Sequence, residues 1–277
     1  MHKIGTLTKI STATFLLYSS ISVAQSSNYA CKAQADKNAV VATQSQRLND
    51  FAWASNTKNL IFIGDEHNKS NPVDISTLIN QIKNQKDVGG KNCLFLEFPS
   101  SMSVEEFKKI LSDPNDNVET LSYRRYYGAI LNTGEASGFK VMLADHPQYF
   151  ESEKTMNERD EAIAKNIFTA FQNKTCDLGI MVVGKAHLAP DEEGRFLVRD
   201  NLKSLGFEST AINLQYANER VTLPRFKSWN GICPEKPTPI SSPVIFKNGP
   251  IADHSVYPLY TSLMKIGYFD LTVLFPQ

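Results

Sequence analysis

The sequence predicts an α/β protein with a mostly parallel central sheet, flanked by helices, and a site at the carboxyl ends of the strands. Three observations support this fold class. Short apolar runs alternate with helical patterns along much of the chain. The runs are apolar throughout, as expected for strands that are buried on both faces of a sheet. Several of them end in titratable side chains, where open α/β sheets place their ligands.

Two of these apolar runs share an ending of glycine, two further residues and histidine. The run at 60–63 continues into Gly64-Asp65-Glu66-His67, and the run at 180–183 continues into Gly184-Lys185-Ala186-His187. The carboxyl ends of parallel strands meet at one edge of a sheet. We therefore expect His67 and His187 to lie close together there, and we take this pair as the functional core.

Further strands and the helices between them complete the pattern. The runs at 93–96 and 139–144 end in Glu97 and in Asp145-His146, and two more strands are expected at 209–214 and 269–275. Ser103 and Glu106 form a capping box that opens a short helix. Apolar periodicity predicts the other helices at 39–55, 74–86, about 119–132, about 153–172 and 195–205.

The long helix at 153–172 carries a charged residue in an unusual place. Arg159 shares its stripe with Ile163 and Asn166, which indicates that the guanidinium faces the core. A buried guanidinium needs a buried anionic partner or a substrate anion. The alternative is a partly exposed Arg159 that pairs with Glu158 or Asp160, and spacing does not choose between the two.

The N-terminal residues are typical of an export signal. Lys3 and Lys9 precede a mostly apolar stretch at 13–23, and small residues allow cleavage after Ala24. We expect residues 1–24 to be a signal peptide, so the protein is exported, either to the periplasm or outside the cell. Residues 25–277 are expected to form a single domain, with an irregular, proline-rich C-terminal segment at 217–277.

Composition and charge narrow the range of partners. The chain has 29 basic and 29 acidic residues. Removal of the predicted signal peptide would leave 27 basic and 29 acidic residues. This balance gives no reason to expect nucleic acid as a partner. No apolar run is long enough for a stable membrane span. The substrate or ligand is therefore expected to be a small molecule or a peptide.

The four cysteines favour disulfides over a metal-thiolate site, because the chain is expected to be exported. Their spacing contains no Cys-x-x-Cys motif, and it leaves all three pairings open. Cys93 and Cys176 both precede apolar strands. We expect these two at the edge of the sheet opposite the site, in a structural role.

Taken together, the motifs resemble those of the erythromycin-esterase/ChaN/TIKI superfamily. They are Gly64-Asp65-Glu66-His67, Leu96-Glu97, Arg159-Asp160-x-x-Ile163-Ala164-x-Asn166-Ile167 and Gly184-x-x-His187. Members of the superfamily carry Gly-Glu-x-His, a strand-end Glu, Arg-Asp-x-x-Met-Ala-x-Asn-Val and Gly-x-x-His in this order. The chain departs from the pattern at Asp65 and Ile163, where Glu and Met are usual. The resemblance implies one α/β domain and functional roles for His67, Glu97, Arg159 and His187.

The superfamily includes ester hydrolases, proposed metal-dependent proteases and haem-binding lipoproteins, so the chemistry must be judged from the residues. We expect a hydrolase of an ester or amide bond. In one version His67, Glu97 and His187 hold a divalent transition metal that activates water. In the other, a histidine oriented by Glu97 is the general base and no metal is needed. In both, Asp65 or Glu66 orients a histidine or accepts a proton, and Arg159 holds a substrate carboxylate or an oxyanion.

Two other functions remain open. A haem- or iron-binding protein of the ChaN type would use Tyr123, Tyr126 or Tyr127 as axial ligands. A catalytically inactive secreted effector module would keep the fold without hydrolysis, metal or haem. The sequence has no Gly-x-Ser-x-Gly elbow of a serine hydrolase and no His-Glu-x-x-His helix of a zincin. Three weaker site candidates are Asp145, His146 and His254.

Overall fold

A computed structural model of the chain was analysed. The structure describes residues 42–67, 70–86, 89–112, 118–149, 154–189, 196–216, 239–247 and 268–276, with only the backbone at 118–122. The predicted signal peptide and the stretch at 217–238 lie outside the described residues.

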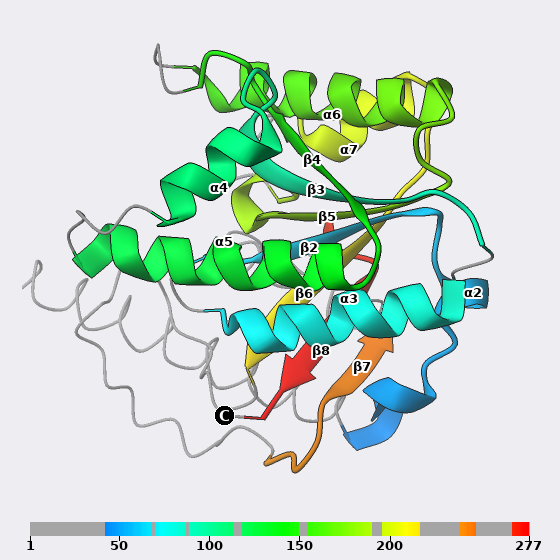
Figure 1. Ribbon diagram of the computed structural model, residues 1–277. Coiled ribbons are helices and arrows are strands. Elements are labelled where there is room, and N and C mark those ends of the chain that lie inside the picture. Colours follow the sequence, from blue (N-terminus) through cyan, green and yellow to red (C-terminus); the bar gives the residue numbers. More distant parts are fainter. Residues whose placement is uncertain are drawn as a thin grey trace, which may run out of the picture.

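An eight-stranded, mostly parallel sheet forms the centre of the described chain (Figure 1). This confirms the predicted fold class. The strand order is β1-β7-β8-β6-β2-β5-β3-β4. All pairs from β8 to β4 are parallel, whereas β7 runs antiparallel to β8 and β1 antiparallel to β7. The strands are β1 (Gln46–Arg47), β2 (Leu60–Asp65), β3 (Asn92–Pro99), β4 (Lys140–Asp145), β5 (Leu178–Gly184), β6 (Thr210–Tyr216), β7 (Val244–Lys247) and β8 (Leu271–Phe275).

Helices cover both faces of the sheet and make a three-layer arrangement (Figure 1). On one face lie α3 (Pro72–Lys86), α4 (Val104–Ser112) and α5 (Val118–Ala136). On the other lie α6 (Met156–Gln172) and α7 (Val198–Ser204). Alternate residues of β2 enter the two cores. Ile61 and Ile63 pack toward α3 and α5, whereas Leu60 and Phe62 pack toward α6 and α7.

The register of the sheet places the two glycine-histidine segments side by side. Asp65 at the end of β2 lies opposite Gly184 at the end of β5. The segments that lead to His67 and His187 therefore leave neighbouring strands at the same level. On the other side of β5, β3 brings Glu97 to the same edge. The predicted position of the site follows from this register.

The predicted helix at 39–55 is wrong over most of its length. Residues 46–56 instead form β1, a 3₁₀ turn (Leu48–Asp50) and the short helix α2 (Trp53–Asn56). Leu48, Phe51 and Trp53 are buried in the core next to α3, and their spacing does not follow a single helical stripe. Tertiary packing thus outweighs the helical periodicity here.

The predicted irregular segment at 217–277 contributes two strands to the sheet. The final strand expected at 269–275 is confirmed as β8. The sequence did not predict β7, which has only four residues and follows Pro243. The backbone N–H of Leu48 donates to the carbonyl of Pro243, which helps to place this edge of the sheet.

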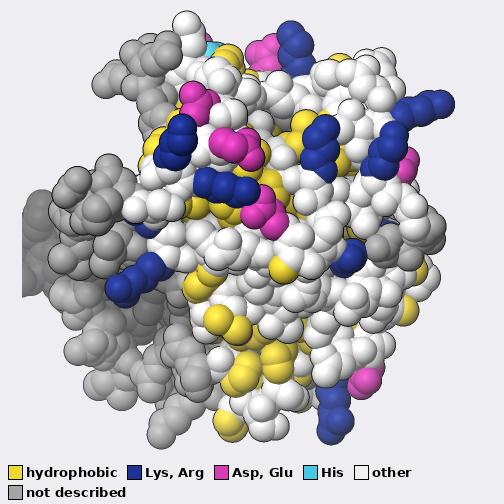
Figure 2. All heavy atoms as spheres, viewed as in Figure 1, with side chains coloured by type: hydrophobic (Ala, Val, Ile, Leu, Met, Phe, Trp, Pro, Cys, Tyr) yellow, Lys and Arg dark blue, Asp and Glu magenta, His cyan; other side chains and the backbone are white. Residues whose placement is uncertain are grey.

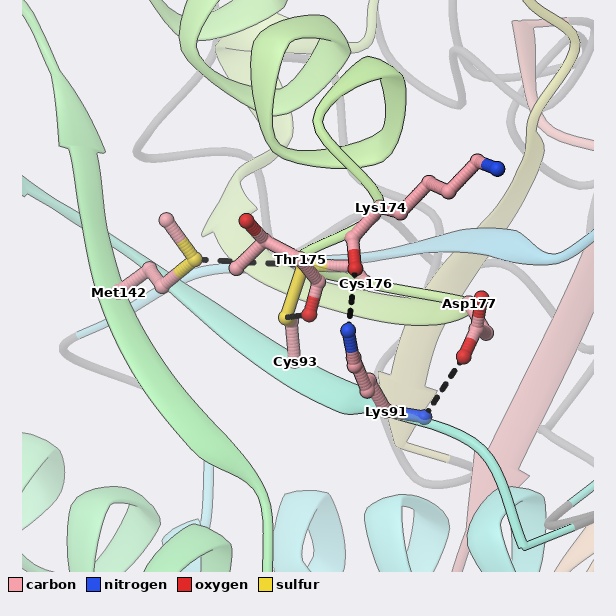
Figure 3. Close-up of a disulfide and its surroundings, with 7 residues drawn as sticks. All are labelled: Lys91, Cys93, Met142, Lys174, Thr175, Cys176 and Asp177. Carbon is pink, nitrogen blue, oxygen red and sulfur yellow. Dashed lines mark hydrogen bonds between the residues drawn. A yellow bond between two sulfur atoms is a disulfide. The ribbon is translucent and has the colours of Figure 1, made fainter.

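A disulfide joins Cys93 and Cys176 where β3 and β5 begin, with a Cα–Cα distance of 5.6 Å (Figure 3). Both cysteines therefore lie at the edge opposite the site, as expected. Beside them, the backbone N–H of Lys91 donates to the Asp177 carboxylate at 2.9 Å. Cys31 and Cys233 lie outside the described residues.

The described surface carries charged side chains of both signs (Figure 2). Figure 2 shows Lys, Arg, Asp and Glu side chains on the visible face, most of them in its upper half, and mainly white and yellow atoms below. None of the described helices combines the length and the apolar character that a membrane crossing requires.

Candidate active site

Glu97 is the centre of the candidate site. Its Oε2 lies 3.1 Å from Nε2 of His67 and accepts the backbone N–H of Gly184 at 2.8 Å. Its Oε1 lies 3.0 Å from Nε2 of His187 and accepts a hydrogen bond from Arg159 at 2.6 Å. The four residues that the resemblance singled out therefore meet at one carboxylate.

His67 lies at the outer side of this cluster, with a side chain that is 21% exposed. Nδ1 of His67 lies 3.0 Å from Oδ1 of Asp65, and its alignment makes the contact an ion pair rather than a well-directed hydrogen bond. Burial alone would lower the pKa of His67. The close contacts with the carboxylates of Asp65 and Glu97, and the negative charges of these groups, outweigh burial and raise the pKa of His67 to about 10.

His187 lies at the inner side, and its side chain is only 2% exposed. Its Nδ1 is hydrogen-bonded to Asp160 on α6, while Nε2 faces Glu97. Burial alone would lower the pKa of His187. The charge of Glu97 and the hydrogen bonds to Asp160 and Glu97 instead raise it to about 9. Both ring nitrogens of His187 thus face carboxylate oxygens, as they do in His67.

Arg159 of α6 has the buried anionic partners that its core-facing position predicted. Its Nε lies 3.2 and 3.1 Å from the two oxygens of Asp145, and the terminal nitrogen that donates to Glu97 also donates to Asp145 at 2.5 Å. The ring of Tyr149 stacks on the guanidinium at 4.0 Å. The alternative pairing of Arg159 with Glu158 or Asp160 is not what the structure has.

The charges around Glu97 control its protonation. Burial alone would raise the pKa of this carboxyl. The positive charges of the two histidines and the hydrogen bonds from them hold the pKa well below its usual range. Glu97 is therefore a stable anion at neutral pH, held between cationic side chains.

Asp65 and Glu66 are adjacent in the chain but lie in different environments. Asp65 is buried and accepts a hydrogen bond from the hydroxyl of Tyr126, and burial raises its pKa. Glu66 points to the rim, with a side chain that is 40% exposed and an oxygen 3.7 Å from Nζ of Lys185. Of the two, Glu66 is the carboxylate that water and solutes reach.

Gly184 has a steric reason to be glycine. A Cβ at this position would lie 3.3 Å from Nε2 of His67 and 3.5 Å from Oε2 of Glu97. Its backbone conformation, φ −57° and ψ 138°, suits any residue. The glycine at this position therefore matters for the close approach of His67 and not for its conformational freedom.

Three tyrosines of α5 surround the imidazole of His67. The ring centroids of Tyr126 and Tyr127 each lie 5.6 Å from that of His67, and the centroid of Tyr123 lies 6.2 Å away. Tyr126 and Tyr127 are buried, whereas Tyr123 is 39% exposed. The sequence offered all three as haem ligands, and only Tyr123 presents an accessible side chain for that role.

The weaker candidates have different outcomes. Asp145 joins the cluster through Arg159. His146 does not: its backbone N–H donates to Asp145, and its Nδ1 accepts the N–H of Gln148, which is a turn contact. His254 lies outside the described residues. Sequence reasoning gave Asp160 no role in the site and considered Tyr126 only as a haem ligand. The only available signals were the position of Asp160 next to Arg159 and the position of Tyr126 in a tyrosine-rich helix.

The described structure shows no preformed metal site. No group of three or more His, Cys, Asp or Glu side chains in the described part of the chain is arranged to hold an ion. A metal binds the lone pair of a neutral imidazole, whereas Nε2 of His67 and Nε2 of His187 both face Glu97. To hold an ion, both rings would have to be neutral and direct this nitrogen at the metal.

A pocket of about 460 Å³ lies beyond the ends of β3 and β4. Its apolar lining comes from Pro99, Met102, Ile110 and Pro147. Pro99 and Pro147 each stand two residues after a carboxylate of the cluster, Glu97 and Asp145. The pocket therefore begins close to the site along two neighbouring strands.

Comparisons with known proteins leave the family of this chain undetermined. No family model matches the chain, and no curated protein matches its sequence. The type III effector HopBA1 is similar in structure, with 18% identity, a TM-score of 0.39, and coverage of 60% of this chain and 82% of HopBA1. ChaN of Campylobacter jejuni, solved with cofacial haem, has 11% identity and a TM-score of 0.36. The match covers 58% of this chain and 83% of ChaN.

A third similar structure is RRSP, a MARTX toxin effector domain from Vibrio vulnificus. It has 19% identity and a TM-score of 0.32, and the match covers 48% of this chain and 28% of that one. Scores this low do not establish a shared function, so the function is argued below from the geometry of this chain.

Proposed function

We propose that this chain is an exported hydrolase of ester or amide bonds whose reaction needs no resident metal. One observation carries the proposal: the histidines of two separate Gly-x-x-His strand ends direct Nε2 at the two oxygens of one carboxylate, Glu97. Buried charge networks of this kind are costly to build, and perturbed titratable groups cluster at functional sites.

The proton positions decide which roles the histidines can take. His67 and His187 are both cations at neutral pH, because their pKa values are raised to about 10 and about 9. A protonated imidazole cannot act as a general base, so this geometry disfavours the metal-free version in which a histidine activates water. Instead, the charge of His67 would stabilise negative charge that develops on the substrate oxygen.

Glu66 is then the group proposed to accept the proton from water. Its carboxylate is accessible at the rim, whereas that of Asp65 is buried against Tyr126. In the proposed step, water attacks the carbonyl carbon, its proton passes to Glu66, and the carbonyl oxygen becomes an oxyanion near His67. The bond to the leaving group then breaks, and Glu66 returns the proton to that group.

His187 and Arg159 would act through Glu97 and not on the substrate. His187 is almost fully buried, and the guanidinium of Arg159 is occupied by Asp145 and Glu97. Their proposed task is to keep Glu97 ionised and fixed, so that Glu97 can hold His67 as a cation. The predicted role of Arg159 as a substrate clamp is less well supported, because its side chain is only 9% exposed.

The test is hydrolysis of a panel of chromogenic esters of increasing acyl length, together with peptide amides, by the purified chain. The pocket beyond the ends of β3 and β4, which is lined in part by Pro99, Met102, Ile110 and Pro147, leads us to expect a preference for substrates with an apolar group. His67→Gln and Glu66→Gln are each expected to lower kcat by about 100-fold. Glu105→Gln on the exposed surface of α4 is the matched control and should keep full activity.

Two outcomes would refute the proposal. One is a wild-type chain that hydrolyses nothing on the panel, which is what an inactive effector module predicts. The other is an active chain whose rate does not change in folded His67→Gln.

Elemental analysis and chelation test the metal-assisted version, in which metal would be bound by the wild type and lost from His67→Ala. We expect activity to survive EDTA.

Haem binding is the second candidate, and the exposure of Tyr123 beside His67 is the observation that favours it. Adding haemin should then give a Soret band that Tyr123→Phe shifts or removes. Tyr268→Phe, which changes another exposed tyrosine, is the control. The absence of a Soret band with the wild type would refute this candidate.

Export and domain organisation also remain proposals. We propose cleavage after Ala24 and one α/β domain over residues 25–277, located in the periplasm or outside the cell. N-terminal sequencing of the exported protein tests the cleavage site.

A further inference from the structure

Tyr126 is placed to control the orientation of Asp65. It lies on α5, is 3% exposed, and donates its hydroxyl hydrogen to Oδ2 of Asp65. Asp65 itself is 1% exposed. The phenol hydroxyl of Tyr126 carries the hydrogen, and the carboxylate oxygen of Asp65 accepts it.

The other oxygen of Asp65 faces the site. Oδ1 lies 3.0 Å from Nδ1 of His67. The torsion that turns an aspartate carboxylate about its own axis has a broad energy profile. A donor that fixes Oδ2 therefore also fixes where Oδ1 points. Tyr126 and His67 therefore contact the two oxygens of the same carboxylate.

The ring of Tyr126 adds a second contact with the same imidazole. The centroids of Tyr126 and His67 are 5.6 Å apart and the ring planes are inclined at 57°. One side chain therefore packs against the imidazole and also holds the carboxylate that pairs with it. The ring of Tyr126 belongs to the apolar core under α5, so its position is fixed by packing.

We propose that Tyr126 is a positioning residue for the proposed hydrolysis: it holds the carboxylate of Asp65 against His67 and so fixes the imidazole beside Glu97. This inference rests on the proposed function for its catalytic consequence. The geometric part, that the Tyr126 hydroxyl sets the environment of the His67 ring, can be tested without any substrate.

The first measurement is the imidazole nitrogen NMR spectrum of the full chain labelled with ¹⁵N-histidine, recorded without substrate. The wild-type signals of His67 are assigned with His67→Gln. Tyr126→Phe removes one oxygen atom and keeps the ring, and it is expected to shift the His67 Nδ1 signal. Tyr216→Phe makes the same chemical change at another hydrogen-bonded tyrosine, whose hydroxyl accepts the N–H of Asn71, and should leave that signal in place.

The second measurement is activity on the substrate found above. Tyr126→Phe is expected to lower kcat by about 10-fold, the usual scale for losing one hydrogen bond to a charged group. KM should stay nearly constant, because Tyr126 lies behind the reacting groups. An unchanged His67 signal in folded Tyr126→Phe would overturn the inference, whatever the rates are. A wild type without activity would refute the proposed function and leave the NMR test in force.

A double variant tests the coupling between Asp65 and Tyr126. Asp65→Glu alone pushes its longer carboxylate onto the buried hydroxyl and should cost at least about 10-fold in kcat. Asp65→Glu combined with Tyr126→Phe gives the added methylene the space of the missing oxygen. We expect the double variant to be more active than the product of the two single losses. Strictly multiplicative losses would contradict a direct coupling of the two residues.

Discussion

At the scale of single residues, Glu97 illustrates why a buried carboxylate needs several partners. It is taken out of water, which disfavours its charge, and two imidazoles, one guanidinium and one backbone N–H then restore that charge. The same contacts keep both histidines protonated. The protonation of each member therefore depends on the others, and changing one should affect all of them.

Arg159 is the member whose loss should affect stability most. Arg159→Met removes the guanidinium and leaves the buried carboxylates of Asp145 and Glu97 without their shared partner. We expect the free energy of unfolding to fall by about 3 to 5 kcal/mol, as when one partner of a buried ion pair is removed. Urea unfolding measures this change. Arg125→Met on the exposed side of α5 should change stability by less than about 0.5 kcal/mol.

The raised pKa values of the histidines predict how stability depends on pH. The pKa is about 10 for His67 and about 9 for His187, against 6.5 for an ordinary histidine. A group with a raised folded-state pKa contributes its full stabilisation below the unfolded-state value, and that contribution is lost as the pH rises through the folded-state value. We therefore expect the Tm to decline between pH 6.5 and pH 10. A double variant, His67→Gln with His187→Gln, should show a flatter profile over the same range.

At the scale of elements, the end of β5 fixes the spacing of the site. A Cβ at Gly184 would lie 3.3 Å from Nε2 of His67, which is tighter than most Cβ contacts, and 3.5 Å from Oε2 of Glu97, which is an ordinary contact. Gly184→Ala should therefore displace the His67 imidazole by a few tenths of an ångström. We expect a loss of at least about 10-fold in kcat with little change in Tm. Gly128→Ala, where an added Cβ meets nothing within 4 Å, should keep full activity.

The elements also show what the sequence could and could not predict. The strands at 60–65, 92–99, 140–145 and 178–184 were predictable because continuous apolar runs have few alternatives in an α/β chain. The four-residue β7 was not predictable, because its pairing with β8 is set by long-range contacts. The helix predicted at 39–55 failed for a related reason, since its apolar residues serve tertiary packing and not one helix face.

The sequence predicted that the strand-end residues of the candidate site meet. It did not predict the contacts that residues of the helices make with them. Parallel strands share a carboxyl edge, so the meeting of His67, Glu97 and His187 follows from the strand pattern alone. Asp160 and Tyr126 could not be assigned in the same way, because their contacts depend on how α6 and α5 pack on the sheet. The protonation of the histidines depends on those contacts as well. The sequence therefore located the site without revealing which group can act as its base.

At the scale of the whole molecule, we expect the disulfide to contribute to stability and not to the activity of the site. Cys93–Cys176 closes a loop of 83 residues at the edge opposite the site (Figure 3). Cross-linking a loop of this size restricts the unfolded chain, which corresponds to about 4 kcal/mol. Replacing both cysteines with alanine should lower the Tm and leave kcat nearly unchanged at temperatures where the variant is folded. A variant that keeps its Tm but loses activity would show that the disulfide instead shapes the site.

The order of the strands affects how the protein is made. β8 is the last strand of the described chain, yet it lies inside the sheet, hydrogen-bonded to β6 on one side and to β7 on the other. During synthesis, β6 and β7 therefore lack the strand that lies between them until residues 271–275 have been added to the chain. Pairings between such distant segments form slowly. Under the proposed export, this delay would be useful, because a translocation machinery that threads unfolded polypeptides could act before the sheet closes.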